Sequence, residues 1–418
     1  MLIWICAALG LGFILTFHQA RMAWWALGVA AWVLAGWGLE IVSPLAAGIL
    51  AAVVAPVLLL LTFRPLRRAI LSRSAMAGFR QIMPRMSATE QAAVEAGNVW
   101  WDAELFAGKP DWRRLLSTPA PRLTAEEQRF LDVETEHLCD LANDWETTSV
   151  WQDLSPEAWS YAKDKGFLGM IVPKAYGGLG FSAYAHSQVI QKLSTRCSAA
   201  AVSVMVPNSL GPAELLLHYG TEDQKNHYLP RLARGQEIPC FALTNPYAGS
   251  DAASITDTGV VCKGMWNGRE TLGFRISWRK RYITLAPVAT LIGMAFRMYD
   301  PDGLLGDTKD IGITLALLPR DTDGVEIGRR HFPLNSTFQN GPIRGKDVFI
   351  PLTQLIGGAE KRGLGWNMLN ECLAVGRSIT LPSTASGGAK AGAVVTGAYA
   401  RIRKQFGLSV GRFEGVEE

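Results

Sequence analysis

One loop of this sequence combines residue types that could bind a phosphate or a cofactor. Residues 244–251 read Thr-Asn-Pro-Tyr-Ala-Gly-Ser-Asp. Small side chains at Ala248 and Gly249 would let backbone N–H groups approach a ligand closely, and Ser250 adds a hydroxyl donor suited to a phosphate oxygen. A Gly-Ser-Asp run is also a common surface turn, so its surroundings have to decide between a binding loop and a simple turn.

Neither the histidines nor the cysteines have a spacing that predicts a metal site or a disulfide scaffold. No two histidines stand at a metal-ligand spacing with a third partner, which favours packing and capping roles. The six cysteines are scattered without a Cys-x-x-Cys pair, which argues against a zinc ribbon or a disulfide scaffold. We therefore predict reduced thiols and no metal site. The histidines considered are His137, His186, His218, His227 and His331.

Length and composition predict more than one folded domain. A chain of 418 residues, 49% of them hydrophobic, can bury one large core or two to three smaller ones. The formal net charge of +4 is small, and the soluble part contains no long basic run. Binding to nucleic acid therefore has little support.

The elements that would position the loop are helical before it and β-rich after it. Residues 122–239 predict an all-α domain, in which Thr124 and Glu127 have the spacing of a capping box. Short β-rich runs then predict an antiparallel sheet or barrel over residues 240–356. Residues 357–418 are helical again and would begin a third domain. The helices are predicted at 156–165, 182–193, 214–218, 366–374 and 389–404, and the strands at 259–262, 272–276, 289–296 and 311–318.

The N-terminal segment, residues 1–63, predicts a membrane anchor. It carries two formal charges, Arg21 and Glu40, and three apolar stretches. The stretch 45–63 is long enough to cross a bilayer as a helix, while 2–17 and 22–39 are near the lower limit. A cleaved signal peptide is the alternative, but no Lys or Arg comes before the first stretch and two more stretches follow it.

Residues 64–121 predict a basic and Trp-rich connector. Six arginines follow the apolar block, and no acidic residue occurs between the end of that block and Glu90. This excess of positive charge predicts a cytoplasmic membrane protein with its body facing the cytoplasm, although a solvated basic linker is the alternative. The expected fold class is α+β, with N-terminal membrane helices, an all-α domain, a β domain and the start of a C-terminal helical bundle.

Several short motifs follow one another in the body of the chain: YGGLG at 176–180, YGTEDQK at 219–225, YLPRL at 228–232, RYIT at 281–284, GLGW at 363–366 and RKQFG at 403–407. Together with the loop 244–251 and the helical–β–helical order, they resemble the acyl-CoA dehydrogenase family from about residue 123 to the end. The apolar N-terminus resembles the long membrane-associated bacterial acyl-CoA dehydrogenases of fatty-acid β-oxidation. Members of that subgroup are much longer, so the chain looks like an N-terminal fragment.

The resemblance implies a site for FAD beside the loop. In the family, the residues at the positions of Phe241, Leu243 and Thr244 line the pyrimidine side of the flavin. The residues at Tyr282 and Thr284 cover its N5 region. We expect the same roles here.

The resemblance also implies contacts to the acyl-CoA and to the far end of FAD. Ser250 matches a serine that touches both cofactor and acyl-CoA, and Arg377 matches an arginine near the substrate channel. Arg403 and Phe406 match residues that reach the adenine and pyrophosphate end of FAD, often across a dimer interface. The pair Arg329-Arg330 could attract CoA phosphates or lie in a solvated turn.

Three positions depart from the family pattern. Asn245 stands where the family usually has Glu, which removes a charge near the flavin. Tyr282 stands where Trp is frequent, and it keeps an aromatic wall. Glu414 stands where Gln is common, which puts the adenine-end contact there in doubt.

The implied reaction removes a hydrogen pair from a saturated acyl-CoA, giving a trans-2-enoyl-CoA and reduced FAD. It needs a carboxylate base with a raised pKa and hydrogen bonds to the thioester carbonyl. In most of the family this carboxylate lies in the third domain, past the end of this chain. In a minority it directly precedes the substrate-channel arginine, where this chain has Gly376. We interpret Glu371 as a surface or packing residue, so we expect no catalytic residue in this chain.

The resemblance implies partners as well. These are an electron-transferring flavoprotein, the membrane and, in the complete protein, further copies of the chain. Two alternatives remain open: an acyl-CoA oxidase that passes electrons to oxygen, and a membrane-bound fragment that binds acyl-CoA or FAD without chemistry.

Overall fold

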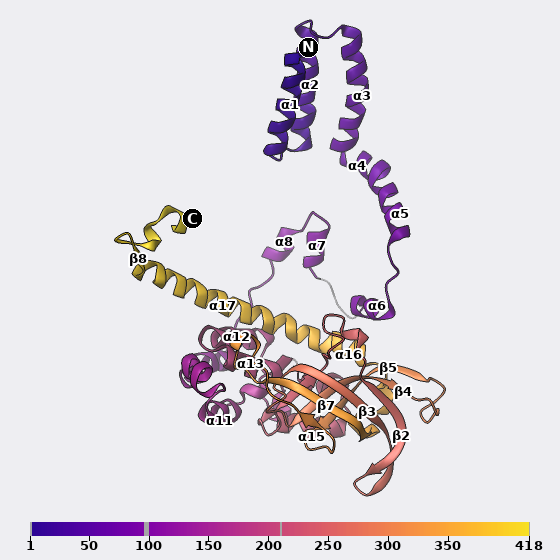
Figure 1. The fold of residues 1–418 in the computed structure, drawn as a ribbon, viewed down its shortest axis with the longest axis vertical. Coiled ribbons are helices and arrows are strands. Elements are labelled where there is room, and N and C mark those ends of the chain that lie inside the picture. Colours follow the sequence, from indigo (N-terminus) through magenta and orange to yellow (C-terminus); the bar gives the residue numbers. More distant parts are fainter. Residues whose placement is uncertain (1, 96–99, 210, 418) are drawn as a thin grey trace. The chain divides into compact units, whose positions relative to one another are not determined.

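A computed structural model describes residues 2–95, 100–209 and 211–417 of the chain (Figure 1). The chain divides into two compact units, Met1–Met86 and Ser87–Glu418. The division falls inside the predicted connector, because a run of helix extends the first unit beyond the apolar block.

The first unit begins with three apolar helices, α1 (Leu2–Phe17), α2 (Met22–Gly38) and α3 (Pro44–Thr62). Trp4 and Trp32 join α1 to α2, with stacked rings whose centroids are 3.8 Å apart. Each indole N–H donates to the backbone carbonyl of the other tryptophan, at 3.1 and 2.9 Å. The indole N–H groups are thus satisfied inside an apolar bundle, where an unpaired donor would be costly.

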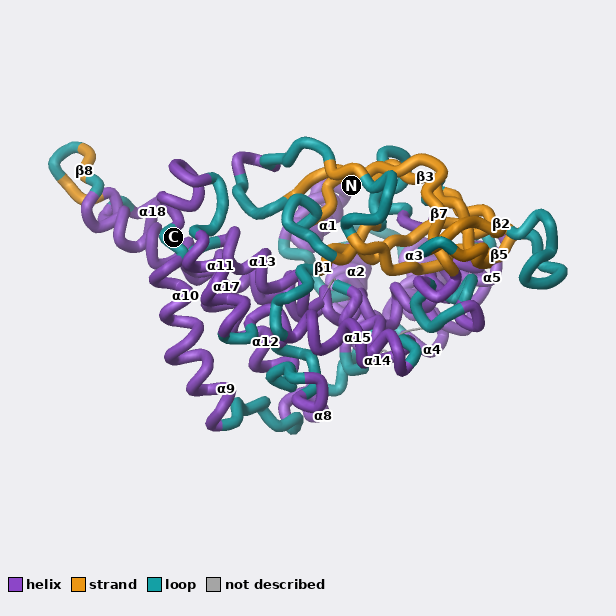
Figure 2. The backbone as a smooth tube through the Cα atoms, turned by 90° about the horizontal axis from the view of Figure 1, so that it is seen from below, coloured by secondary structure: helices purple, strands orange, loops and turns teal. Residues whose placement is uncertain are grey.

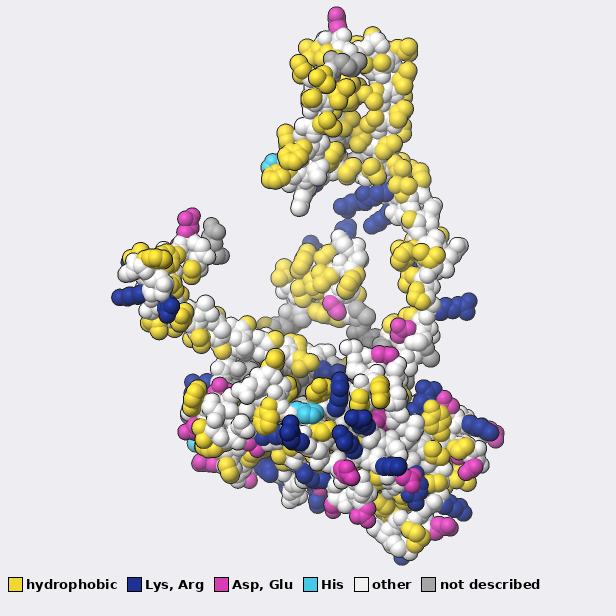
Figure 3. Space-filling view, viewed as in Figure 1, with side chains coloured by type: hydrophobic (Ala, Val, Ile, Leu, Met, Phe, Trp, Pro, Cys, Tyr) yellow, Lys and Arg dark blue, Asp and Glu magenta, His cyan; other side chains and the backbone are white. Residues whose placement is uncertain are grey.

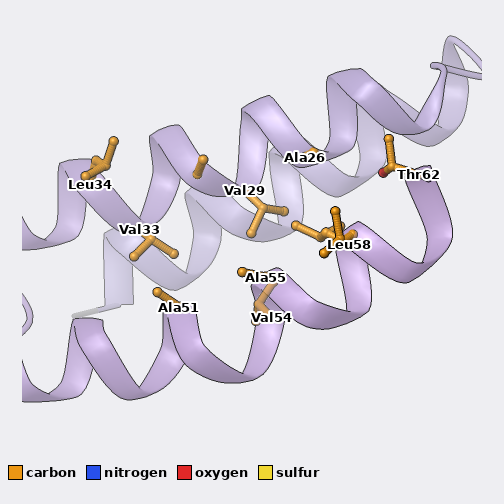
Figure 4. A pocket seen from close by; sticks show the side chains of 11 residues that line it. Ala26, Val29, Val33, Leu34, Ala51, Val54, Ala55, Leu58 and Thr62 are labelled. Carbon is orange, nitrogen blue, oxygen red and sulfur yellow. The ribbon is translucent and has the colours of Figure 1, made fainter. Parts of the chain in front are cut away.

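Helices α2 and α3 enclose an apolar hollow of about 500 Å³ (Figure 4). Its lining consists of Ala, Val and Leu side chains and Thr62. No titratable side chain lines it, so it offers no group for acid–base chemistry.

Among the described residues, two helical segments are long and apolar enough to cross a bilayer. Pro44–Thr62 has a mean hydropathy of 2.6 and is 6% buried. Ser198–Tyr219 is 82% buried, which is typical of a core segment in a folded domain. The first unit ends with α4 (Arg64–Arg67), a π-helical turn (Arg68–Ser72) and α5 (Arg73–Ile82).

The second unit opens with short helices and then forms a helical domain. The Trp366 indole donates to the Thr89 carbonyl at 2.9 Å, so the start of this unit packs onto its C-terminal part. Thr124 and Glu127 make the predicted capping box at α9, and Ser155 caps α11. The helices are α6 (Ala88–Glu95), α7 (Asp102–Phe106), α8 (Trp112–Leu116), α9 (Ala125–Arg129), α10 (Thr135–Leu141), α11 (Pro156–Asp164), α12 (Ala183–Arg196), α13 (Ser198–Ser209), α14 (Pro212–Tyr219) and α15 (Glu222–Ala233).

A seven-stranded sheet follows, with the order β1-β4-β2-β3-β7-β6 and with β5 beside β4. Helices α13 and α14 contact β1, and Figure 2 shows the strands gathered together beside the helices. The expectation of an antiparallel sheet is wrong for β4, which runs parallel to both β1 and β2, because two reversals of the chain after β2 restore its direction. The strands are β1 (Pro239–Ala242), β2 (Thr258–Trp266), β3 (Arg269–Thr284), β4 (Leu291–Tyr299), β5 (Asp310–Pro319), β6 (Glu326–Ile327) and β7 (Asn340–Pro351).

The C-terminal part is dominated by one long helix, α17 (Ala374–Ile402), which follows α16 (Gly365–Met368) and a π-helical turn. Its first half packs on the helical domain, where Ser383 bonds Ser187 at 2.8 Å and Thr380 bonds Ser209 at 3.2 Å. Its second half is exposed and ends in the hairpin β8 (Lys404–Gln405) and β9 (Leu408–Ser409), followed by α18 (Glu414–Glu417) (Figure 1). The predicted helical, β and helical order is confirmed.

Candidate functional site

The two segments that the sequence assigns to the flavin lie against each other. The backbone N–H of Arg281 donates to the Thr244 carbonyl at 3.1 Å. The Lys280 ammonium donates to the Leu243 carbonyl at 2.8 Å. We call residues 241–251 and 279–284 together the cradle.

An irregularity in the sheet makes the first of these bonds possible. The register between β3 and β7 shifts between Lys280 and Ile283. Such a bulge takes residues out of the ladder and re-aims their side chains. Tyr282 lies in this interval with a φ of 57°, a left-handed conformation that is uncommon for a non-glycine residue. The Arg281 N–H can therefore bond the loop instead of β7.

A buried ion pair holds the cradle from beneath. The Lys280 ammonium and the Asp257 carboxylate are 2.6 Å apart, and their side chains are 0% and 3% exposed. The other Asp257 oxygen accepts from the Arg279 N–H at 2.9 Å. Burial lowers the pKa of Lys280, although the Asp257 carboxylate acts in the opposite direction. Breaking either half would leave an unpaired charge in the core, so the pair fixes β3 relative to the loop.

Asn245 links this ion pair to the loop and accounts for the departure from the family's Glu. Its amide nitrogen donates to Asp257 at 3.0 Å, and its oxygen accepts from the N–H groups of Tyr247 at 2.9 Å and Ala248 at 2.7 Å. A carboxylate here would face Asp257 without a proton to share. The amide supplies two N–H donors, for Asp257 and for the Thr256 hydroxyl at 3.1 Å, and an acceptor for the loop N–H groups, as the surroundings require.

The aromatic wall stands at the open edge of the cradle. Tyr282 is 53% exposed, with its ring 4.8 Å from the Arg281 guanidinium and 5.1 Å from the His331 ring. Asn340 donates to the Tyr282 carbonyl at 3.2 Å and to the Thr284 hydroxyl at 3.4 Å. His331 bonds the Asn340 amide oxygen at 3.3 Å through Nδ1. Asn340 on the neighbouring strand β7 and His331 in the segment before it thus support the two residues that were predicted to cover the flavin.

The cradle opens onto a basic surface. A hollow of about 230 Å³ is lined by residues that include Pro246, Tyr282 and His331, and an adjoining one of about 350 Å³ shares His331 with it. Four arginines and one glutamate line the two, and Figure 3 shows blue side chains gathered on this unit. The arginines and the glutamate are Arg279, Arg281, Arg329, Arg344 and Glu326. Planar guanidinium groups beside open loop backbone suit a phosphate-bearing ligand.

The loop itself is open enough for a ligand. A Cβ added at Gly249 would meet no atom within 4 Å, and Ser250 is exposed. Ala248 is buried and anchors the loop from below. The backbone and the Ser250 hydroxyl are therefore accessible, as the close approach of a phosphate requires.

The other predicted residues lie on α17 and its hairpin. Arg377 is exposed near the start of the helix, and Arg403 is exposed at its end. Phe406 is 95% exposed, with Phe413 as its ring neighbour at 6.4 Å. Within the described part of the chain, no hydrogen bond or ring contact joins these three residues to the cradle.

Neither candidate position for a base offers a free carboxylate. A Cβ at Gly376 would lie 2.5 Å from the Ser209 carbonyl oxygen, so α17 packs too closely there for a side chain. The Glu371 carboxylate accepts a hydrogen bond from the Tyr219 hydroxyl. This contact agrees with the packing role expected for Glu371.

Four residues of the site were not singled out for it from the sequence: Asp257, Lys280, His331 and Asn340. One signal was available for Lys280, which continues the buried alternation of Ile276 and Trp278 along β3. A lysine on the buried face of a strand indicates a buried partner. No local sequence pattern predicts that Asp257 is this partner or that Asn340 belongs to the site.

Comparison with known proteins places this geometry in a family. Residues 125–236 match the acyl-CoA dehydrogenase N-terminal domain, and residues 240–348 match the acyl-CoA dehydrogenase middle domain. The probable acyl-CoA dehydrogenase YngJ of Bacillus subtilis is 32% identical over 254 residues, covering 60% of this chain and 62% of that protein. The protein HemX of Proteus mirabilis is 60% identical over 104 residues, covering 25% of this chain and 61% of that protein.

Solved structures give the same result for the fold. An acyl-CoA dehydrogenase from Geobacillus kaustophilus superposes with a TM-score of 0.61 at 25% identity, covering 72% of this chain and 74% of that one. Structures with this fold include complexes with FAD. The chain spans about three fifths of the length of the two curated relatives, 61% and 62%. With both family domains matched in order and the fold shared, the chain belongs to the acyl-CoA dehydrogenase family.

Proposed function

We propose that this chain carries the flavin-binding part of an acyl-CoA dehydrogenase that oxidises saturated acyl-CoA to trans-2-enoyl-CoA in fatty-acid β-oxidation. The observation that carries the proposal is the cradle, in which Arg281 bonds Thr244 and Lys280 bonds Leu243. Two segments almost 40 residues apart form one rigid, open surface. A rigid surface of this kind is what a planar cofactor needs in order to be held in one orientation.

FAD fits the residues that are present. The backbone of Phe241 to Thr244 would face the polar edge of the flavin, with Tyr282 and Thr284 beside it, and the Ser250 hydroxyl would meet a phosphate. Bound FAD would supply an acceptor for the β hydride of the substrate. The basic surface around Arg281 raises the local concentration of a polyanionic ligand such as FAD or acyl-CoA.

Proton removal from the α carbon needs a carboxylate that we do not assign to this chain. Gly376 is pressed against Ser209, and Glu371 is bonded to Tyr219. These two contacts favour, as a second candidate, a chain that binds FAD and acyl-CoA but does not dehydrogenate by itself. We expect the 418-residue chain to show no dye reduction with acyl-CoA, and a normal rate would contradict our placement of the base.

We further propose that residues 1–63 anchor the protein in the cytoplasmic membrane with its body in the cytoplasm, and that electrons pass to an electron-transferring flavoprotein. The long apolar helix Pro44–Thr62 and the arginines that follow it support the anchor. The exposed Tyr282 at the edge of the cradle supports electron exit at this face. We also propose that the protein forms homo-oligomers.

A spectral titration tests the proposed function. The FAD-loaded chain is titrated with a trans-2-enoyl-CoA, with free CoA as the control. We expect a saturable shift of the flavin absorbance with the enoyl-CoA and none with CoA, because the acyl group would lie against the ring. A flavin spectrum that no acyl-CoA perturbs would contradict the proposal.

A further inference from the structure

Helix α5 has an apolar face flanked by arginines. Its large apolar side chains, Met76, Phe79 and Ile82, recur every three residues and lie on one face, and they are 53%, 56% and 77% exposed. Arg73 and Arg80 are seven residues apart and share a face that adjoins the apolar one, since they stand three residues before and four residues after Met76. In the described part of the chain, nothing covers the apolar face. A ten-residue helix in water would gain nothing from such a face, so a partner is required.

The charge around α5 has one sign. Arginines occur at six positions between residues 64 and 85, and no acidic residue occurs from residue 41 to residue 89. The six are Arg64, Arg67, Arg68, Arg73, Arg80 and Arg85. A surface of this kind complements an anionic partner.

The position of α5 in the chain identifies the partner. The helix begins at Arg73, soon after the apolar helix α3 ends at Thr62. Nine of the residues between, Arg64–Ser72, are helical and span roughly 14 Å, so if α3 crosses a bilayer, α5 has to start close to its surface. Figure 3 shows the hydrophobic surface of α1–α3 giving way to blue side chains where α3 ends.

We propose that α5 lies in the headgroup region of an anionic bilayer, with Met76, Phe79 and Ile82 at the acyl boundary and the arginines on lipid phosphates. This inference rests on the proposed membrane anchoring and adds to it a second contact that depends on lipid charge. A protein partner is the less favoured occupant, because the chain itself brings α5 to a lipid surface, and binding in this plane is typical of basic amphipathic helices.

The experiment uses the full chain with two kinds of vesicle: phosphatidylcholine alone, and phosphatidylcholine mixed with phosphatidylglycerol. Flotation reports whether the chain binds, and amide hydrogen exchange of peptides from residues 73–83 reports whether α5 is covered. The variants are Arg73→Gln/Arg80→Gln and Met76→Ser/Phe79→Ser. The matched control is Ser74→Ala/Gln81→Ala, which alters the polar face without changing charge.

We expect the exchange of α5 to be slower with anionic vesicles than with neutral ones. Each arginine near an anionic surface favours binding about fivefold, so the double Arg→Gln variant should lose roughly 25-fold in protection. The double Ser variant should lose protection on both vesicles, and the control should behave as the wild type.

The outcomes separate the two proposals. Equal exchange of α5 on both vesicles, with the chain floating, overturns the α5 inference and keeps the anchor; a protein partner for α5 would give this result. Binding to anionic vesicles alone, with α5 protected, overturns the anchor and keeps the inference. A chain that floats on neither overturns both.

Discussion

The cradle and the end of α17 were both predicted to touch FAD, yet the structure builds them differently. The cradle is held by a buried ion pair, an amide bridge and backbone bonds, with Lys280 and Asp257 almost fully buried. Arg403 and Phe406 lie on an exposed hairpin whose bonds are local, such as Val410 N–H to the Arg403 carbonyl at 2.8 Å. The cradle is therefore preassembled by the chain itself, whereas the hairpin depends on something else to bring it to a ligand.

The two halves of α17 differ in the same way. Its first half is tied to α12 and α13, and its second half is exposed. A residue on the packed half takes its position when the chain folds. A residue on the exposed half would reach a ligand only after the chain associates with a partner. Substitutions in the preassembled region should therefore change stability and FAD affinity much more than substitutions in the exposed region.

Removing the buried ammonium should have the largest effect. Lys280→Met leaves the Asp257 carboxylate unpaired in the core, so we expect the free energy of unfolding to fall by about 3–5 kcal/mol. Urea unfolding of the full chain measures it. Arg279→Met, on the exposed side of the same strand, is the matched control and should change it by less than about 0.5 kcal/mol. Equal effects of the two substitutions would show that the ion pair does not hold the cradle.

The helical domain that packs against α17 should lose stability in acid. Burial pushes the pKa of Glu127 upward, but bonds from the N–H groups of Thr124 and Ser182, at 2.8 and 2.7 Å, outweigh it and lower the pKa to about 2. Because the folded-state pKa is depressed, this stabilisation is present above the unfolded pKa near 4.5 and is lost as the pH falls towards 2.

Glu127→Gln should therefore lower the free energy of unfolding by about 2–3 kcal/mol at neutral pH, with the difference from wild type shrinking below the unfolded pKa. Denaturant unfolding at several pH values measures it. Glu126→Gln, at an exposed neighbour, is the control. A difference that stays constant with pH would contradict the assigned pKa.

Loosening the loop alone should have a moderate effect. Asn245→Ala removes the acceptor for two backbone N–H groups, which costs about 1–2 kcal/mol and should weaken FAD binding roughly tenfold. Fluorescence titration with FAD measures it, and Asn367→Ala on the exposed side of α16 is the control. Unchanged FAD affinity in Asn245→Ala would mean that the loop order is irrelevant to the cofactor.

The smallest effect is expected at the hairpin. Arg403→Ala should change the free energy of unfolding by less than about 0.5 kcal/mol and leave the FAD affinity of this chain unchanged, because the side chain is exposed. Thermal unfolding and FAD titration measure both. A loss of FAD in this variant would show that the hairpin reaches the cofactor without further help.

Local signals explain which parts of the fold were predictable. The capping box at Thr124 and the runs that became β2 to β5 depend on neighbours in sequence, and the sequence located them. Helix α13 was missed because it is buried on all sides and shows no stripe. Strand β7 was missed because Gly341, Pro342 and Gly345 interrupt its alternation.

In the site, too, the sequence located the features that depend on local motifs and missed those that depend on distant contacts. Family motifs indicated Thr244 and Tyr282, and the structure brings their segments together. The residues that hold them, Asp257 and Asn340, lie 23 and 58 residues from their partners Lys280 and Tyr282. Their roles depend on strand register, which no local pattern determines. The contacts of Arg403 with a ligand remain a prediction.

The most direct test of the account compares two exposed aromatic residues, Tyr282 in the cradle and Phe406 on the hairpin, by FAD titration of the full chain. Tyr282→Ala should weaken FAD binding roughly tenfold, since an aromatic contact contributes up to about 1.5 kcal/mol, and Phe406→Ala should bind FAD as the wild type does. If Phe406→Ala loses FAD while Tyr282→Ala retains it, the cradle is not where this chain holds its flavin.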